Sequence, residues 1–168
     1  MGHITAKKGY GDLVKRLNKF PQGVPPSETL FKILNVLFSE EEAKLVSLLP
    51  VKPFTAKVAA KAWKKPLKDT EVILNELASR ALLIDVNVDG NPVYSLPPPM
   101  AGFFEFSMMR IGGKVDQHVL GELFYQYMNV EDEFVTALMS LPTPIGRTFV
   151  QEETITEHKT EVLDFERA

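Results

Sequence analysis

The chain contains no cysteine among its 168 residues. These residues can therefore form no disulfide bond, supply no thiol nucleophile and hold no thiolate-ligated zinc ion or iron–sulfur cluster. The three histidines are scattered, without the His-x-x-x-His or Glu-x-x-His spacing of a metal site, and no glycine-rich phosphate loop follows a predicted strand. We therefore predict a chain that is not an enzyme, with no catalytic residue, metal ligand or cofactor of its own.

Long hydrophobic runs are also missing from the sequence. No stretch approaches the roughly 18 consecutive apolar residues of a membrane-spanning helix. The first residues carry lysines but lack the continuous apolar segment of a secretory signal. We therefore expect a cytoplasmic protein with no membrane partner.

The sequence has no excess of positive charge. Its formal net charge is -3 and its pI is near 5.7, which argues against a surface dedicated to nucleic-acid phosphates. Apolar residues make up 45% of the chain and charged residues 24%, as is usual for a globular protein. A DNA-binding function therefore requires a local basic patch.

The most informative pattern lies between residues 54 and 96. A helix is predicted from Ala56 to about Lys64, ended by Pro66, and Asp69 is a suitable N-cap for a second helix. The residues expected on the inner faces of these two helices are Val58, Ala59, Ala62, Trp63, Val72, Ile73, Leu77 and Ala81. This spacing predicts a helix-turn-helix.

A predicted β-hairpin follows the second helix. The run 82–88 is rich in β-branched residues, Asp89-Gly90 favours a tight turn, and residues 93–96 form the returning strand. Pro92 restricts its strand to the edge of a sheet, because proline cannot donate a ladder hydrogen bond. The helix-turn-helix and this hairpin together predict a winged helix.

Helical patterns flank the winged helix on both sides, and Ser39 with Glu42 predicts a capping box between two of the earlier helices. We predict a mainly α-helical chain with a small β-hairpin, a winged helix-turn-helix followed by a helical extension and an extended acidic tail. The predicted segments are an N-terminal helix with a proline-rich link at 1–26, the winged helix at 27–97, the helical extension at 98–145 and the tail at 146–168.

Two sets of residues are candidate binding sites. The aromatic and methionine residues after the proline triplet could form a partner or dimer interface, although such side chains also bury well in a core. These are Met100, Phe103, Phe104, Phe106, Met108 and Met109. The alternative is a DNA-binding surface made of Lys57, Lys61, Lys64, Lys65, Lys68, Asn75 and Arg80.

The DNA interpretation has a weakness in the second helix, which would enter the major groove. Glu71 and Glu76 occupy its outward positions, and Asp85 and Asp89 stand in the hairpin where a DNA reader usually carries a cation. DNA is therefore the less favoured partner, and a solvated basic face is the simpler interpretation of the lysines.

Several blocks of the sequence carry a family resemblance. These are GYGDLVKRLNKFPQGVPPSETL, FSEEEAKLVSLLPVKPFT, YSLPPPMAGFFEFSMMR, GELFYQYMNVEDEF, GRTFVQEETI and VLDFERA. Together they resemble the N-terminal half of bacterial 4Fe-4S ferredoxin-type iron–sulfur proteins, over nearly the whole chain. In that family a cysteine-rich, cluster-binding segment follows the equivalent of VLDFERA.

The resemblance implies that these residues form the accessory module of an electron-transfer protein. No cluster-binding cysteine can be assigned to a position here, so the 4Fe-4S clusters are implied only for a missing C-terminal domain. We expect the chain to be a fragment of such a protein, and the alternative is a naturally shortened form. The expected partners are a redox partner protein or the chain's own C-terminal iron–sulfur domain, with a homodimer as a further possibility.

Overall fold

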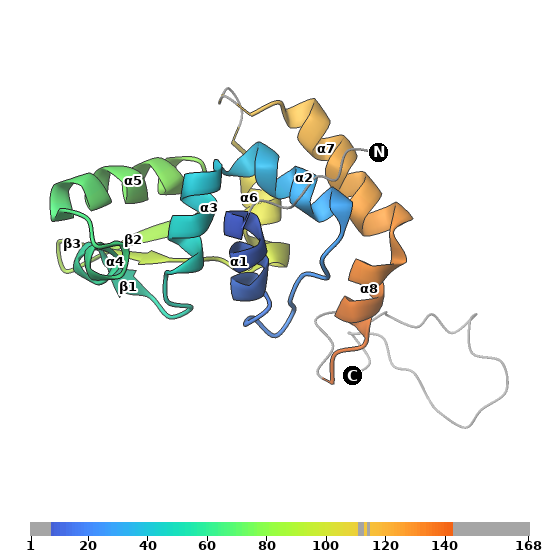
Figure 1. Ribbon diagram of the computed structural model, residues 1–168, viewed down its shortest axis with the longest axis horizontal. Helices are drawn as coiled ribbons and strands as arrows, with labels where there is room; N and C mark the ends of the chain where they lie inside the picture. The colour runs from blue at the N-terminus through green and yellow to red at the C-terminus, as the bar shows by residue number, and fades with distance from the viewer. Residues whose placement is uncertain (1–7, 111–112, 114, 143–168) are drawn as a thin grey trace, which may run out of the picture.

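The computed structural model describes residues 8–110, 113 and 115–142, and helices dominate this part of the chain (Figure 1). The first helices are α1 (Lys8–Leu17), α2 (Glu28–Leu37) and α3 (Glu40–Ser47). The middle elements are β1 (Phe54–Thr55), α4 (Ala56–Trp63), α5 (Leu67–Ser79), β2 (Ile84–Val88) and β3 (Asn91–Ser95). The last are the π-helical turn η1 (Pro99–Phe103), α6 (Phe104–Met108), α7 (Gln117–Tyr125), the π-helical turn η2 (Gln126–Val130) and α8 (Asp132–Met139). The prediction of a mainly helical chain with a small β-structure is confirmed.

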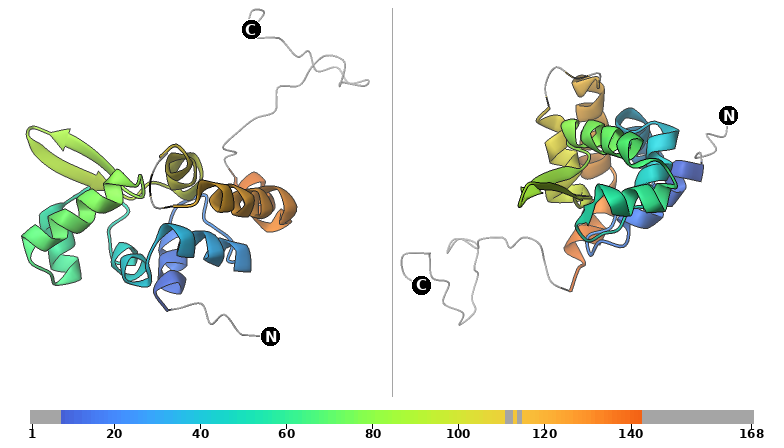
Figure 2. Two further views of the ribbon diagram at one scale, coloured as in Figure 1. Left: turned by 90° about the horizontal axis from the view of Figure 1, so that it is seen from above. Right: turned by 90° about the vertical axis from the view of Figure 1, so that its left-hand side faces the viewer.

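The strands form a three-stranded antiparallel sheet in the order β1-β3-β2. The predicted hairpin is present, and Asp89 (φ +50°) and Gly90 (φ +80°) form its turn with the positive φ angles that a two-residue hairpin turn needs. In Figure 2, seen from above, this hairpin extends outward at one end of the molecule beside α4 and α5. Helices α7 and α8 lie at the other end.

The prediction that Pro92 lies on an edge strand is wrong, because β3 is the central strand of the sheet. The short β1 strand explains how the sheet accepts a proline there. β1 pairs only with Tyr94 and Val93, so it ends before it reaches Pro92. On the side of β3 away from β2, no strand among the described residues therefore lies opposite the proline and needs its missing N–H group.

Local capping chemistry sets the start of α3. The Ser39 hydroxyl accepts a hydrogen bond from the Glu42 backbone N–H (3.2 Å), and the Glu42 carboxylate accepts one from the Ser39 backbone N–H (2.7 Å). This capping box confirms the prediction. Asp69, by contrast, is not the N-cap of α5, because the helix begins at Leu67 directly after Pro66.

The buried face of α5 also differs from the predicted one. Val72 was expected to point inward, but 67% of its surface is exposed, while Leu74, Leu77 and Ala78 are buried. Val58 on α4 is likewise exposed. The two helices pack against each other and α4 packs on β1 and β3, so their inner stripes are rotated relative to the pattern read from the sequence.

One cluster of buried side chains reaches from Tyr10 on α1 to Leu138 on α8. Helix α1 packs mainly on α3, and α2 packs on α7, so the predicted segments 1–26, 27–97 and 98–145 share this core. Tyr127 ties the C-terminal helices to the proline-rich link, because its hydroxyl donates a hydrogen bond to the Pro25 carbonyl (2.8 Å). Burial, with smaller contributions from Glu131 and Glu133, raises the pKa of the Tyr127 phenol.

The predicted tail at 146–168 lies outside the described residues. None of the helices within the described ranges is both long and apolar enough to cross a membrane.

Candidate functional site

Lysines gather on the exposed side of α4 and on the turn that follows it. The exposed lysines are Lys57 and Lys61 on α4, Lys64 at its C-cap and Lys68 in the first turn of α5. Lys64 ends α4 with a left-handed backbone conformation (φ +54°). Lys65 is half-buried, and its ammonium lies 3.3 Å from the Glu41 carboxylate. The predicted basic face is therefore present, with Lys65 turned partly toward α3.

The other two predicted DNA-binding residues serve the fold. The Tyr94 hydroxyl donates a hydrogen bond to the Asn75 side-chain oxygen (2.7 Å). The Arg80 guanidinium donates to the Leu37 carbonyl at the end of α2 (3.0 Å) and forms an ion pair with Glu42. Asn75, through its side-chain oxygen, and Arg80, through its guanidinium donors, therefore hold α5 against the sheet and against the α2–α3 junction.

The outward side of α5 and the hairpin is acidic and apolar. Glu76, Asp85 and Asp89 are exposed, and Val72 is the most exposed apolar residue of α5. Burial raises the pKa of the Tyr94 phenol, and the negative charges of Asp85 and Glu71 raise it further. This electrostatic environment is unfavourable for a polyanionic ligand.

The predicted aromatic and methionine interface divides between the core and the surface. Phe103 and Phe104 are buried, with their ring centroids 4.8 Å apart in an edge-to-face arrangement. Phe104 also packs on Phe124 of α7 at 4.8 Å. These two residues are core residues in this fold, because η1 and α6 fold back onto α7. Met100 and Phe106 are half-buried, and Met108 and Met109 are exposed.

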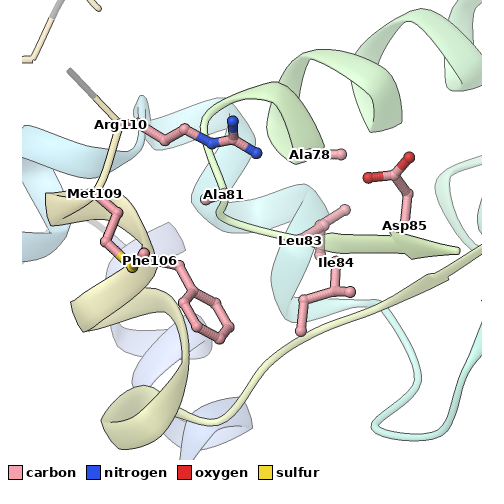
Figure 3. A pocket seen from close by; sticks show the side chains of 8 residues that line it. All are labelled: Ala78, Ala81, Leu83, Ile84, Asp85, Phe106, Met109 and Arg110. Carbon is pink, nitrogen blue, oxygen red and sulfur yellow. The ribbon is translucent and has the colours of Figure 1, made fainter.

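A surface hollow of about 510 Å³ lies where α6 approaches the junction of α5 and β2. In Figure 3, Phe106 and Ile84 lie on the same side of this hollow, and the Arg110 guanidinium points across it toward the side where Asp85 lies. The remaining lining residues are Ala78, Ala81, Leu83 and Met109. The aromatic and methionine pattern had predicted Phe106 and Met109, whereas the other lining residues carried no recognisable signal.

An exposed apolar stripe continues from the hollow along β2. Ile84, Val86 and Val88 are 38%, 56% and 48% exposed. In the strand register Asp85 lies opposite the buried Tyr94, and Val86 lies opposite Val93. Because side chains alternate between the faces of a strand, the stripe occupies the sheet face opposite to Tyr94. The alternation of Ile84, Val86 and Val88 in the sequence was the signal that could have identified it.

Within residues 8–110, 113 and 115–142, no three histidine, aspartate or glutamate side chains come together to hold a metal ion. No family model matches the chain, and the searches of curated proteins and of solved structures gave no match either. The fold and the surface thus define a helical protein with a small antiparallel sheet that exposes a basic face on α4 and an apolar stripe on β2.

Proposed function

We propose that this chain is a non-enzymatic winged-helix docking module of a cytoplasmic 4Fe-4S ferredoxin-like electron-transfer protein. The order of its elements supports the winged-helix assignment. A short strand, two helices and a hairpin follow one another, and the sheet order β1-β3-β2 pairs the hairpin with the strand that precedes the two helices. Helix α4 also packs on β3. Such a module docks or scaffolds a partner, which here is a redox protein or the chain's own iron–sulfur domain.

The observation that carries the docking role is the character of the hairpin surface. Val86 and Val88 are about half exposed, and the exposed acidic residues Asp85 and Asp89 accompany them on the same strand and turn. Exposed apolar side chains that adjoin a hollow and carry a polar rim are typical of protein–protein contacts. A DNA reader would need cations at these positions to contact phosphates and base edges.

The iron–sulfur part of the proposal rests on the family resemblance. The cluster ligands would lie in a segment beyond these residues, since the chain has no cysteine. The sharpest test is to read the gene downstream of Ala168. We expect an in-frame, cysteine-rich segment, whereas a stop codon directly after Ala168 would contradict the electron-transfer assignment and leave a stand-alone docking module.

DNA binding remains a second candidate function because of one observation. Lys57 and Lys61 lie on the exposed side of α4, Lys64 is its C-cap, and Lys68 follows in the first turn of α5. A row of lysines could follow a phosphate backbone without reading the sequence. In this alternative the protein is a winged-helix transcriptional regulator.

We expect the purified chain to show no specific DNA binding. Titration with duplex DNA should give at most a weak, sequence-independent affinity, with a Kd in the range of about 10⁻⁴–10⁻⁶ M near physiological salt. The test compares the wild-type chain with a triple variant, Lys57→Gln, Lys61→Gln and Lys64→Gln, at about 50 mM and 200 mM salt. A matched control removes exposed lysines elsewhere, through Lys15→Gln, Lys32→Gln and Lys44→Gln.

Both triple variants should weaken any residual binding equally, because each removes the same charge from the surface. Tight binding that prefers one DNA sequence, and that only the α4 triple variant abolishes, would establish the regulator in place of the docking module.

A further inference from the structure

Strand β2 has an open edge. Among the described residues it pairs only with β3, and the strand order places it at the side of the sheet. All five of its residues are exposed, and Figure 2 shows the hairpin at one end of the molecule, beside α4 and α5 and far from α7 and α8. An exposed edge strand presents unpaired N–H and C=O groups, to which another strand can add.

Pro92 determines which backbone groups face this open edge. It lies opposite Asn87 and has no N–H group, so this pair cannot exchange the two hydrogen bonds of a hydrogen-bonded pair. Because the two kinds of pair alternate along an antiparallel ladder, Val86 and Val88 bond to β3. The N–H and C=O groups of Asp85 and Asn87 therefore point outward.

The outward backbone N–H and C=O groups of β2 can bond to those of a second, antiparallel β2 strand when Val86 of one copy lies opposite Val86 of the other. In this register Asp85 of each copy lies opposite Asn87 of the other, and both residues have outward backbone groups as the ladder requires. Shifting the register by two residues in either direction places Asp85 opposite Asp85, or Asp85 opposite Asp89. Both alternatives oppose like charges, which destabilises a cross-strand pair.

The apolar stripe matches itself in the same register. Val86 lies opposite Val86, and Ile84 lies opposite Val88 of the other copy, so exposed apolar side chains of the two strands meet on one face. A two-fold axis through Val86 satisfies both copies at once, which is the condition for a closed dimer.

We propose that β2 is a self-association edge, to which a second copy of this chain adds its own β2 in antiparallel orientation, centred on Val86. The two sheets then join into one. This interface specifies a partner for the proposed docking module, and it rests on that proposed function.

The hollow beside β2 fits the same arrangement. In the proposed register, the hairpin turn of the second copy comes next to Leu83, which lines the hollow together with Arg110. The turn carries the exposed carboxylate of Asp89, which has the charge opposite to Arg110. Asp85 lines the hollow as well, so in the dimer Arg110 is the cation beside one carboxylate from each copy.

Sedimentation velocity of the intact 168-residue chain tests the proposal. An edge contact buries less than a standard interface, so we expect a dimer with a Kd on the order of 100 μM and a sedimentation coefficient that rises between about 5 and 500 μM protein. Val86→Lys should weaken the dimer at least about tenfold, because it places two ammonium groups opposite each other.

Val72→Lys is the matched control. Val72 is more exposed than Val86 but lies on α5, so this variant adds the same charge without touching the edge. It should associate like the wild-type chain. Both valines are solvent-exposed, and circular dichroism at low concentration verifies that each variant is folded.

The absence of cysteine permits a direct test of the register. Val86→Cys should form a disulfide-linked dimer under mild oxidation at least about tenfold faster than Val72→Cys, because the two-fold axis holds the two sulfurs at a high effective concentration. A mixture of Ile84→Cys and Val88→Cys chains should form the mixed disulfide in preference to either symmetric one.

A chain that stays monomeric at every concentration would overturn the proposal. This holds also if the chain is monomeric because another of its segments covers the β2 edge. Equal cross-linking of Val86→Cys and Val72→Cys would overturn it as well. Either result leaves the docking function intact, because the downstream gene sequence and the DNA titration decide that function separately.

Discussion

Replacing Phe103 with alanine should lower the free energy of unfolding by about 3–5 kcal/mol. The Phe103 ring is fully buried and meets Phe38 of the α2 end edge-to-face at 6.3 Å and Phe104 at 4.8 Å. It therefore joins the N-terminal helices to the aromatic cluster of the C-terminal helices. The alanine variant loses this burial and leaves a cavity between two parts of the molecule that pack around the ring.

Urea denaturation followed by far-UV circular dichroism measures this loss. Met109→Ala is the control, because Met109 belongs to the same aromatic and methionine segment but is 73% exposed. It should change the free energy of unfolding by no more than about 0.5 kcal/mol. If Phe103→Ala were as mild as the control and instead altered self-association, Phe103 would belong to a surface contact, as the sequence pattern allowed.

Features set by neighbouring residues were predictable from the sequence. The Ser39–Glu42 capping box and the Asp89-Gly90 turn each depend on side chains and backbone angles within four consecutive residues. The helices of the C-terminal half also follow their apolar periodicity, apart from the π-helical turns at η1 and η2. In these cases local chemistry and the tertiary fold favour the same structure.

Features that depend on distant partners were not predictable. The two-residue strand β1 exists only because Phe54 and Thr55 pair with β3, and this pairing converts β3 from an edge strand into the central one. The rotation of the α5 inner face follows from its packing on α4. Periodicity alone specifies that a helix is amphipathic, but its neighbours determine which residues at the margin of the stripe are covered.

The candidate site shows the same division. The lysines of α4 are exposed as the pattern indicates, since long charged side chains on a solvent face need no partner. Asn75 and Arg80 carry the same polar character in the sequence, yet each bonds to a residue far away along the chain. Residue type therefore predicted the available chemistry, and the fold decided where it was used.

Arg80→Met should destabilise the fold by about 1.5–3 kcal/mol and weaken any residual DNA binding no more than the loss of another single cation, such as Arg110→Met, does. It is therefore the variant that best separates structure from recognition. The Arg80 guanidinium donates to the Leu37 carbonyl, one of the carbonyls at the C-terminus of α2 that lack an intrahelical partner, and it pairs with Glu42. Methionine keeps the apolar stem of the side chain but provides none of these donors. Glu42 then keeps only its capping contact with the Ser39 N–H, and the Leu37 carbonyl loses its donor.

Thermal and urea unfolding of Arg80→Met, Arg80→Lys and Arg110→Met measure this role. Lysine should recover only part of the lost stability, because a single ammonium cannot reproduce the planar two-partner geometry of the guanidinium. Arg110→Met, at an exposed arginine, should change the free energy of unfolding by no more than about 0.5 kcal/mol. A stable Arg80→Met chain with DNA affinity weakened more than in Arg110→Met would reverse the assignment and return Arg80 to the recognition surface. Because Glu42 caps α3 and also pairs with Arg80, we expect the loss of stability to extend to α3. Amide exchange in α3 should therefore be faster in the Arg80→Met chain than in the wild-type chain. Such a result would show that the Arg80 guanidinium holds α5, α2 and α3 together.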